Sequence, residues 1–351
     1  MSGRTANLDP MPPASKRATL RDVADATGLS PSGVSYALRG LQSTPETQQR
    51  VRAAADKLGY EVDPIARALA SGRSGMIGLL CGSLDDLWQQ LLAASVGREL
   101  LENDRYALIL DARGDPEREL TMARQLRDQR VDGLIVSSLD PSSPDWAKVT
   151  KAVPVVSIGD ALQGASAGEV LFDNRAGVTL ALDHLKSLGH RRIAVLTPTL
   201  ASTPDRPAEV HVSAEAERLG LDLSVVASPH TLPEATLVAR EVMSRRPRPT
   251  AVFSFADSIA YGAYAAAREL GLAIPDDVSI CGYDNHPLSA LLSPELTTVD
   301  WDTEGIVRDA VRLVLAAAEG GHRRKRITKS PQLIVRGSTS RPRRPASRRA
   351  G

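Results

Sequence analysis

The 351-residue sequence lacks several features that would each indicate a class of protein. It has no run of eighteen or more apolar residues, so it predicts no membrane-spanning helix and no membrane partner. Its first residues, MSGRTANLDPMPPASKR, contain no apolar core of the kind found in secretory signals. Only two cysteines occur, Cys81 and Cys281, both within apolar runs, which favours small buried thiols in a reducing compartment. We therefore expect a cytoplasmic protein.

The residue patterns that catalysis requires are missing as well. The six histidines show no metal-ligand spacing of the H-x₃-H type. There is no G-x-S-x-G nucleophile elbow and no G-x-x-x-x-G-K-[ST] phosphate loop. The glycine-rich stretch 72–78 precedes a strand-like run, whereas a dinucleotide-binding loop follows a strand. We expect no catalytic residue, no metal and no cofactor; an enzyme on a parallel-sheet scaffold is the alternative that these absences oppose.

The net charge of +1 hides an uneven distribution of charged residues. Residues 322–351 hold eleven Lys and Arg and no acid, which leaves 32 basic against 42 acidic residues in the rest of the chain. The final RPRRPASRRAG is basic and proline-rich, so it predicts a disordered tail. Such a tail either attracts phosphates in a salt-sensitive way or only improves solubility.

Residues 19–39 read TLRDVADATGLSPSGVSYALR and predict two short helices joined by a glycine turn. Thr19 can cap the first helix, and Asp22, three residues on, completes a capping box. Gly28 permits the sharp turn, because glycine adopts left-handed geometry at little steric cost. Ser30 then caps a second helix that has proline at its first position. This is the outline of a helix-turn-helix, whose second helix enters the major groove of DNA.

A third helix follows, capped by Thr44, started by Pro45 and ended by Gly59. Its predicted apolar face consists of Val51, Ala54, Ala55 and Leu58. Three short helices with this spacing also fit a small helical bundle without a role in DNA binding, and spacing alone does not separate the two interpretations.

After residue 75 the pattern changes to strand-like apolar runs that alternate with helical ones. Seven strands are expected, at residues 76–80, 106–110, 133–136, 153–158, 193–196, 251–255 and 278–281. This alternation predicts an α/β fold with parallel sheets wrapped by helices. Ligands of open parallel sheets bind beyond the carboxyl ends of the strands, so residues just after strands are candidate contacts.

Several stretches resemble the LacI/GalR family of bacterial transcription regulators, and the likeness runs from about residue 19 to residue 339. They include TLRDVADATGLSPSGVSYAL, TQQRVRAAADKLGY and DPIARALASGRSGMIGLL. Others are LFDNRAGVTLALDHLKSLGHRRIAVL, PTAVFSFADSIAYGAYAAARELGLAIPDDVSICGYDN and SPELTTV. The resemblance implies an all-α helix-turn-helix domain, a hinge helix and a two-lobed core like a periplasmic binding protein, with parallel sheets.

The family's activity follows as an expectation. The resemblance implies a sequence-specific regulator, a repressor, that binds near-palindromic double-stranded operator DNA as a homodimer. A small-molecule effector would bind between the lobes, and the family implies a sugar, a nucleoside or a related metabolite. In the hinge, Leu69 matches the leucine that enters the minor groove, where an apolar wedge unstacks a base step. Without the family, this segment would be an ordinary amphipathic turn.

The predicted DNA contacts combine base-reading residues of the second helix, phosphate contacts and hinge residues. They are Thr19, Leu20, Arg21, Ser30, Pro31, Ser32, Gly33, Ser35, Tyr36, Arg39, Thr44, Thr47, Tyr60, Ala66 and Leu69. Tyr36 stands where the family usually has arginine. Arginine can bond guanine twice, whereas tyrosine offers one hydroxyl and a ring, so we expect an operator altered at that base.

The predicted effector contacts are Asp86, Trp88, Ser137, Asp160, Phe172, Arg206, Asp257, Asp284 and Trp301. By resemblance, Arg206 and Asp284 face each other across the cleft, where a guanidinium and a carboxylate can hold several hydroxyls. Trp301 replaces a common glutamine and offers an indole for stacking. An aspartate after a strand also serves as a helix cap, and either tryptophan can belong to the core.

The expected organisation has five parts: a disordered tail (1–18), the helix-turn-helix domain (19–62), hinge helix and linker (63–75), a two-lobed effector-binding and dimerisation domain (76–338) and a disordered basic tail (339–351). We expect a cytoplasmic, nucleoid-associated regulator. Residues 198–215 match the family least, which keeps open a regulator that answers to a protein partner or to no effector. A pure small-molecule-binding protein is a further alternative.

Overall fold

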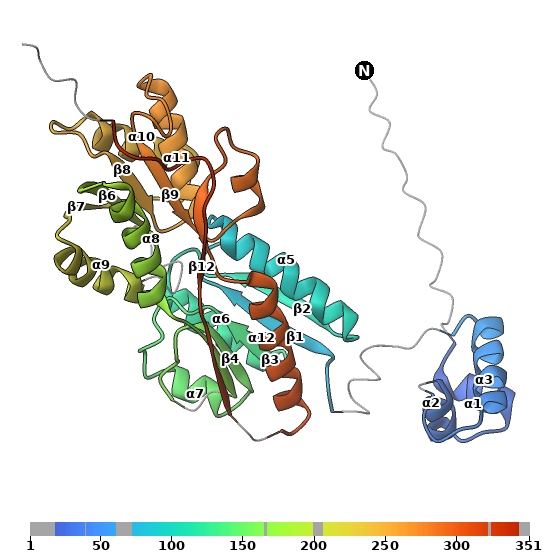
Figure 1. Ribbon diagram of the computed structural model, residues 1–351. Helices are drawn as coiled ribbons and strands as arrows, with labels where there is room; N and C mark the ends of the chain where they lie inside the picture. Colours follow the sequence, from blue (N-terminus) through green and yellow to red (C-terminus); the bar gives the residue numbers. More distant parts are fainter. Residues whose placement is uncertain are drawn as a thin grey trace, which may run out of the picture. The chain divides into compact units, whose positions relative to one another are not determined.

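A computed structural model describes residues 18–38, 40–60, 72–164, 167–198, 206–321 and 324–343, without the side chains of residues 206–209. The chain divides into two compact units, Met1–Ser74 and Gly75–Gly351. Figure 1 shows helices α1, α2 and α3 in the first unit and helices around sheets in the second.

In its described residues the first unit contains α1 (Leu20–Thr27), α2 (Pro31–Leu38) and α3 (Pro45–Leu58). Its small core is made by Val23, Ala24, Val34, Ala37, Val51 and Ala55. Leu58 does not join this core as predicted, because its side chain is 41% exposed. The end of α3 therefore packs through Ala54 and Ala55, one turn earlier.

The helix ends form as their sequence signals predict. The Thr19 hydroxyl accepts from the amide of Asp22, and the Asp22 carboxylate accepts from the amide of Thr19, which completes the capping box. Gly28 has φ +68°, the left-handed conformation that ends α1. Thr44 caps α3, and Gly59 ends it with φ +61°.

The second unit contains two six-stranded sheets, each the centre of one lobe. Sheet 1 has the order β11-β5-β4-β3-β1-β2, and all its neighbouring strands are parallel. Its strands are β1 (Met76–Cys81), β2 (Tyr106–Asp111), β3 (Gly133–Val136), β4 (Val155–Gly159), β5 (Gly168–Phe172) and β11 (Lys325–Lys329). The predicted parallel α/β fold is confirmed.

Sheet 2 has the order β12-β10-β9-β8-β6-β7, and only the β10–β12 pair is antiparallel. Its strands are β6 (Arg192–Pro198), β7 (Asp222–Ser228), β8 (Ala251–Ser254), β9 (Ser279–Tyr283), β10 (Thr297–Asp300) and β12 (Gln332–Ile334). The first five strands of each sheet thus repeat the same order. In both sheets the order in which strands are added reverses beside the first strand, between β1 and β3 and between β6 and β8.

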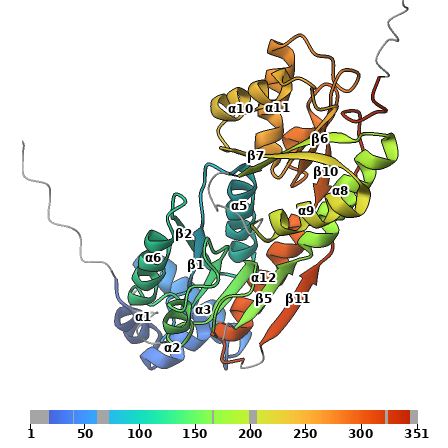
Figure 2. The ribbon, with the colours of Figure 1, turned by 90° about the vertical axis from the view of Figure 1, so that its left-hand side faces the viewer.

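Helices cover both faces of each sheet (Figures 1 and 2). In the first lobe α5 (Leu87–Glu102) and α12 (Thr303–Ala318) share one core, and α6 (Pro116–Asp128) and α7 (Trp146–Thr150) share the other. In the second lobe α8 (Asn174–Leu188) and α9 (Arg206–Leu219) cover one face, and α10 (Leu232–Ser244) and α11 (Asp257–Glu269) cover the other. A short 3-10 helix, η1 (Pro287–Ala290), follows β9.

The chain passes between the lobes three times, after β5, after β10 and after β11. Contacts join these crossovers. The amide of Asp173 donates to the carbonyl of Lys329 at 3.0 Å, and the rings of Phe172 and Trp301 stack with centroids 4.8 Å apart. The Lys329 ammonium lies 2.8 Å from the Asp309 carboxylate. Movement of one lobe against the other must therefore bend three connected segments.

Five strands were not predicted from the sequence: β5, β7, β10, β11 and β12. Most of them lie toward an edge of a sheet, where one side of the strand stays in water and a polar sequence is tolerated. β11 reads KRITK, which has no apolar run at all. Lysine on an edge strand opposes pairing with another chain.

Two glycines on helices make a matched test of packing in the second unit. A Cβ on Gly262 of α11 would lie 2.5 Å from the Cβ of Ala235 and 2.7 Å from its carbonyl carbon, whereas one on Gly97 of α5 would meet nothing within 4 Å. We expect Gly262→Ala to cost about 1–3 kcal/mol, because backbone cannot move aside. Gly97→Ala should stabilise by about 0.5–1 kcal/mol. Urea unfolding measures both; equal effects would contradict the tight α10–α11 contact.

Candidate functional site

Helix α2 presents a small polar face to solvent. Ser32 and Tyr36 are exposed, and Gly33 and Ser35 are half-buried, while Val34 and Ala37 point into the core. The Ser30 hydroxyl accepts from the amide of Gly33 at 3.1 Å, so it caps the helix as predicted. The face offers hydroxyl groups and one aromatic ring, which suit base edges and thymine methyl groups.

The remaining predicted DNA contacts in the described part also lie at the surface. Thr19, Arg21, Pro31 and Thr44 are exposed. Leu20, Thr47 and Tyr60 are half-buried, and Leu20 and Tyr60 pack against the core of this unit. Three predicted contacts, Arg39, Ala66 and Leu69, lie outside the described residues.

Three of the predicted effector contacts follow strands of sheet 1. Asp86, Ser137 and Asp160 come after β1, β3 and β4, which are neighbours in the sheet. β1 and β3 flank the point where the strand order reverses, and ligands of open α/β sheets bind beyond the carboxyl ends at this point. The fold therefore brings these side chains to the edge of the sheet where a ligand is expected. The side chain of Arg206 lies outside the described residues.

Asp86 is completely buried at the N-cap of α5, where its Oδ1 accepts from the amide of Trp88 at 3.0 Å. Its Oδ2 has no hydrogen-bond partner. Nδ1 of His230, from the second lobe, lies 3.8 Å from Oδ1 of Asp86 and 2.9 Å from Oγ of Ser258. Burial raises the pKa of Asp86 to about 7 and lowers the pKa of His230 to about 4. These groups make a polar contact between the lobes.

Sequence reasoning missed His230 and Ser258. His230 follows β7, and that strand was not recognised, so the rule that ligand contacts follow strands did not reach it. Recognition of β7 from its alternating LSVVA would have added His230 to the candidates. Ser258 lies in the first turn of α11, and no local pattern marks it.

The predicted aromatic contacts gather in one ring cluster. Trp88 meets Phe172 edge-on at 5.7 Å, and Phe172 stacks on Trp301. Trp301 in turn meets Tyr283 at 5.5 Å. Trp88 and Trp301 are only 3% and 2% exposed, so both also belong to the core that the lobes share. Phe172 is half-buried.

Asp257, which was predicted as an effector contact, is held by four protein donors. Its Oδ1 accepts from the Tyr283 amide and the Thr298 hydroxyl, and its Oδ2 accepts from the His286 amide and the Ser289 hydroxyl. The side chain is fully buried, and protein donors use both of its oxygens. A ligand would have to displace one of them. Asp257 therefore holds β9, β10 and η1 together.

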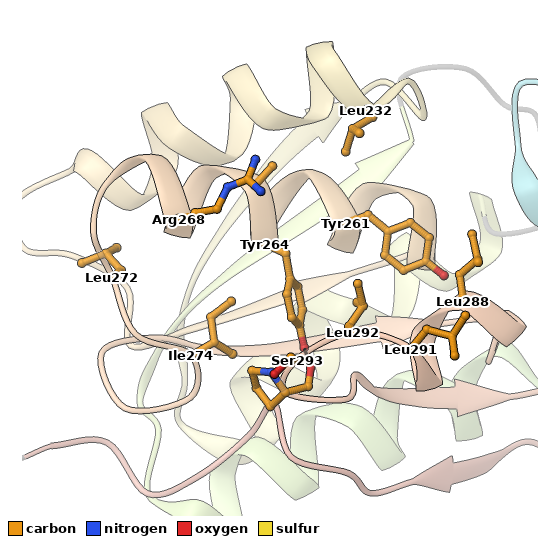
Figure 3. A pocket seen from close by; sticks show the side chains of 12 residues that line it. Leu232, Tyr261, Tyr264, Arg268, Leu272, Ile274, Leu288, Leu291, Leu292 and Ser293 are labelled. Atoms are coloured by element: carbon orange, nitrogen blue, oxygen red, sulfur yellow. Dashed lines mark hydrogen bonds between the residues drawn. The ribbon is translucent and has the colours of Figure 1, made fainter.

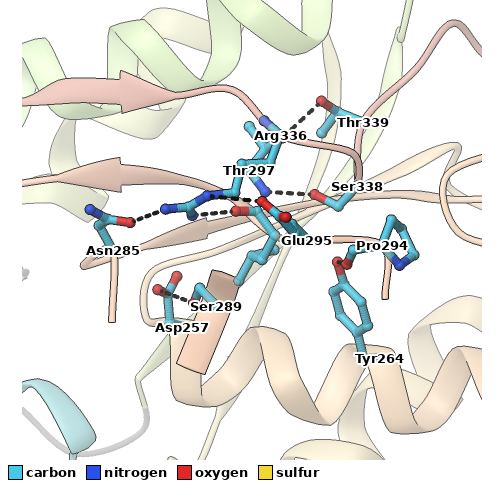
Figure 4. A network of polar contacts seen from close by, with 11 residues as sticks. Asp257, Tyr264, Asn285, Ser289, Pro294, Glu295, Thr297, Arg336, Ser338 and Thr339 are labelled. Carbon is cyan, nitrogen blue, oxygen red and sulfur yellow. Dashed lines mark hydrogen bonds and ion pairs between the residues drawn. The ribbon is translucent and has the colours of Figure 1, made fainter. Parts of the chain in front are cut away.

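Asp284 lies beside this network with its backbone in an unusual conformation. Its φ of +124° and the φ of +51° at Asn285 are rare for residues other than glycine. The Asp284 amide donates to the Val299 carbonyl, and Arg336 donates to the Asn285 amide oxygen at 2.7 Å (Figure 4). Strain of this kind persists where surrounding contacts fix it, and it gathers at functional sites. Asp284 is 8% exposed.

A groove of about 620 Å³ lies on the second lobe, between α11 and the segment that includes η1 (Figure 3). Its lining is mostly apolar and consists of Leu232, Tyr261, Tyr264, Ala265, Arg268, Leu272, Ile274, Leu288, Leu291, Leu292, Ser293 and Pro294. Leu291 is 78% exposed and Leu288 is 45% exposed. No sequence motif marks this surface, because its residues come from three separate segments.

Within the described ranges, no group of three or more His, Cys, Asp and Glu is placed to hold a metal ion. None of the helices found there is both long and apolar enough to cross a membrane.

The chain is similar over most of its length to transcription regulators. It is 34% identical to the HTH-type transcriptional regulator MalR of Streptomyces coelicolor, over 92% of this chain and 96% of that one. It is 28% identical to the HTH-type transcriptional repressor PurR of Vibrio atlanticus, over 92% and 98%. Residues 182–339 match the model of a periplasmic binding protein-like domain.

Solved structures of transcription regulators are also similar to this chain. A Lac repressor dimer bound to operator and the anti-inducer ONPF superposes with a TM-score of 0.79 at 25% identity, covering 93% of this chain and all of that one. A complex of the transcriptional regulator CelR with cellobiose has a TM-score of 0.66 at 25% identity, covering 92% and 100%. The fold and the helix-turn-helix thus define a transcription regulator, not an enzyme. The chain belongs to the LacI family, as the sequence motifs predicted.

Because the Asp86 carboxylate is buried, we expect its replacement by a neutral amide to stabilise the protein in a pH-dependent way. Folding raises the pKa of this acid, so the charged form is less stable in the folded protein than in the unfolded chain. The acid therefore destabilises the fold most at pH values above the folded-state pKa, and not at all at pH values below the unfolded-state pKa. Asparagine caps helices as well as aspartate does. We expect Asp86→Asn to raise the melting temperature at pH 8 by roughly 2–4 °C per kcal/mol regained, and by less as the pH falls from 7 toward 4.

Asp115 is the matched control for this substitution, because it caps α6 from an exposed position. Asp115→Asn should leave the melting temperature nearly unchanged at pH 5 and pH 8. A pH-independent effect of Asp86→Asn would show that its carboxylate is not buried as described.

Proposed function

We propose that this regulator is a homodimeric repressor that reads near-palindromic operator DNA and responds to a small molecule bound between its lobes. The observation that carries the proposal is the exposed polar face of α2 in a helix-turn-helix whose helices have capped N-termini. The same chain carries a two-lobed core with polar side chains beyond its strands, which gives the regulator a place to bind a ligand.

The proposed division of labour assigns each contact the role that the family resemblance implies for its position. Ser32, Gly33, Ser35 and Tyr36 read base edges in the major groove. Thr19, Arg21, Thr44, Thr47 and Tyr60 contact phosphates and fix the position of the head on the duplex. Leu69 of each subunit enters the minor groove at the centre of the operator, with Ala66 beside it.

Control of DNA binding follows from the lobes and their three crossovers. An effector that contacts Asp86, Ser137 and Asp160 on one lobe and Asp284 on the other stabilises one lobe arrangement. That arrangement changes how the two hinges meet the operator, so effector and DNA are thermodynamically linked. The relatives support an effector of this kind: CelR is known in complex with cellobiose, and a Lac repressor dimer in complex with operator and the anti-inducer ONPF.

We propose that the groove beside α11 is the dimer surface of the second lobe. Exposed leucines around an apolar hollow are costly in water and mark contact sites. A second copy is the occupant that fits, because an operator with two half-sites is read by a protein with two-fold symmetry. The Lac repressor whose fold this chain shares was solved as a dimer.

A protein that reads chromosomal DNA acts where the chromosome is, so we place its activity in the cytoplasm at the nucleoid.

The proposal is tested by selecting bound duplexes from a random double-stranded pool at near-physiological salt. We expect a near-palindrome whose centre carries a pyrimidine–purine step, since such steps kink most easily. Salt-sensitive binding with no enriched sequence would refute the specific-regulator proposal, because it would mean that only charge is read.

Tyr36 provides the sharpest single test of base reading on the selected duplex. We expect Tyr36→Ala to weaken binding by roughly 1–3 kcal/mol, about 10- to 100-fold, and to relax the preference at one base pair. Tyr36→Phe separates the two contacts: it keeps the affinity if the ring touches a thymine methyl and loses it if the hydroxyl bonds a base. Unchanged affinity of Tyr36→Ala for the duplex would contradict the proposal that α2 binds in the major groove.

The dimer surface is tested by placing a charge in the groove. We expect Leu291→Glu to produce monomers in sedimentation equilibrium, because a carboxylate in an apolar contact loses its hydration. Leu237→Glu is the control: Leu237 is 54% exposed on α10 but does not line the groove. Both substitutions should leave the far-ultraviolet circular dichroism unchanged. A Leu291→Glu protein that stays dimeric would show that the groove is not the dimer interface.

A further inference from the structure

Buried carboxylates in the described part of the chain are, as a rule, matched by donors. Glu119 accepts from the Leu139 amide and the Ser138 hydroxyl. Glu169 is paired with Arg324 and Arg326, and Asp257 has the four donors given above. This matching is expected, because a buried charge without a partner costs several kcal/mol.

Asp86 breaks this rule, and Asp160, which is half-buried, also has no protein partner in the described part of the chain. Oδ2 of Asp86 is buried without a hydrogen-bond partner, and Asp160 has neither a hydrogen bond nor an ion pair within the described residues. Burial raises the pKa of Asp160 to about 6. The nearest ring nitrogen to Asp86 belongs to His230, whose pKa is lowered by burial, so at neutral pH that histidine adds no positive charge.

The two unmatched carboxylates lie at one edge of sheet 1. Asp86 follows β1 and Asp160 follows β4, and β3 lies between these strands. Strands in a sheet are about 4.8 Å apart, so the two strand ends are roughly 10 Å apart, the span of a small molecule. Ser137 follows β3, between them, and its hydroxyl is buried without a partner too. Two buried polar groups without a partner, Asp86 Oδ2 and Ser137 Oγ, thus lie on neighbouring strand ends beside the half-buried carboxylate of Asp160, and such groups call for a ligand as their explanation.

Aromatic rings are concentrated at the same place. Of the twelve aromatic side chains in the sequence, six form one contact cluster: Trp88, Phe172, Phe253, Phe255, Tyr283 and Trp301. Trp88 is two residues from Asp86, and its amide donates to that carboxylate. Aromatic faces attract cations, as carboxylates do, and both disfavour anions.

We propose that the effector of this regulator is a small cation, a molecule with a protonated or quaternary ammonium group that is held by Asp86 and Asp160. The inference rests on the proposed function, since it names the class of ligand for that same site. The ammonium supplies the donor or the charge that Asp86 lacks, and the neighbouring rings of Trp88 and Phe172 contact its carbon atoms. Phosphorylated ligands are rejected, because they would bring negative charge to two unmatched carboxylates.

The test uses matched pairs of probes with the full-length protein. Choline is paired with 3,3-dimethylbutan-1-ol, its neutral isostere, D-glucosamine with D-glucose, and ethanolamine with ethylene glycol; D-glucose 6-phosphate is the anion. Affinities are measured by thermal shift at pH 7.5. We expect the ammonium member of at least one pair to bind about tenfold or more tightly than its neutral partner, with no shift from the phosphate.

Substitutions then locate the preference. Asp86→Asn and Asp160→Asn should remove the advantage of the ammonium probe, whereas Asp115→Asn, an exposed helix cap, should keep it. The proposal is overturned if neutral partners bind as tightly as the ammonium probes, if the phosphate binds best, or if no ammonium probe shifts the protein.

A DNA-binding assay distinguishes these outcomes from a failure of the proposed function. The same preparation is assayed on duplexes selected from the random pool. Specific DNA binding without a preference for ammonium probes would contradict only the proposed class of effector. If no sequence is enriched from the pool, the regulator proposal itself is contradicted.

Discussion

The larger unit depends on one constraint of parallel sheets, that neighbouring strands all end at the same edge. Residues 86, 137 and 160 are far apart in the sequence, yet each follows a strand of sheet 1, so the fold delivers them to one place. Because each sheet reverses its strand order beside its first strand, a space opens there between diverging connections. The chemistry of the site is therefore decided by a few loop residues, while the strands behind them only need to be apolar.

The second lobe shows how this edge is kept in shape. Asp257 uses four protein donors to fix β9, β10 and η1, and its own amide donates to Asp284 at 3.3 Å. The strained backbone at Asp284 is stable only because these contacts and Arg336 surround it. The same η1 contributes Leu288 to the apolar groove, and Ser289 bonds both Asp257 and Tyr261. The proposed effector site and the proposed dimer surface thus share one rigid support.

Local signals made the first unit predictable from sequence, and tertiary packing set the limit elsewhere. Thr19, Gly28 and Thr44 act within three or four residues, so their roles can be recognised without a fold. The ends of β1, β3 and β4 followed from the alternation of apolar runs. Asp257 shows the limit of a local pattern, because an aspartate after a strand looks the same in sequence whether it binds a ligand or fixes a loop. His230 and the groove were missed because only the folded chain brings their neighbours together.

The charge of the head explains why the two units must work together. Residues 19–62 contain five basic and five acidic residues, so a single head has no excess charge with which to hold DNA. Its affinity must come from a few placed contacts, and such contacts are weak one at a time. When two heads are linked, binding of the second head becomes intramolecular, and the overall affinity rises by orders of magnitude although neither head gains a contact. The proposed dimerisation through the larger unit is then a condition for reading DNA at all, and in this proposal a ligand that changes the spacing of the heads controls binding.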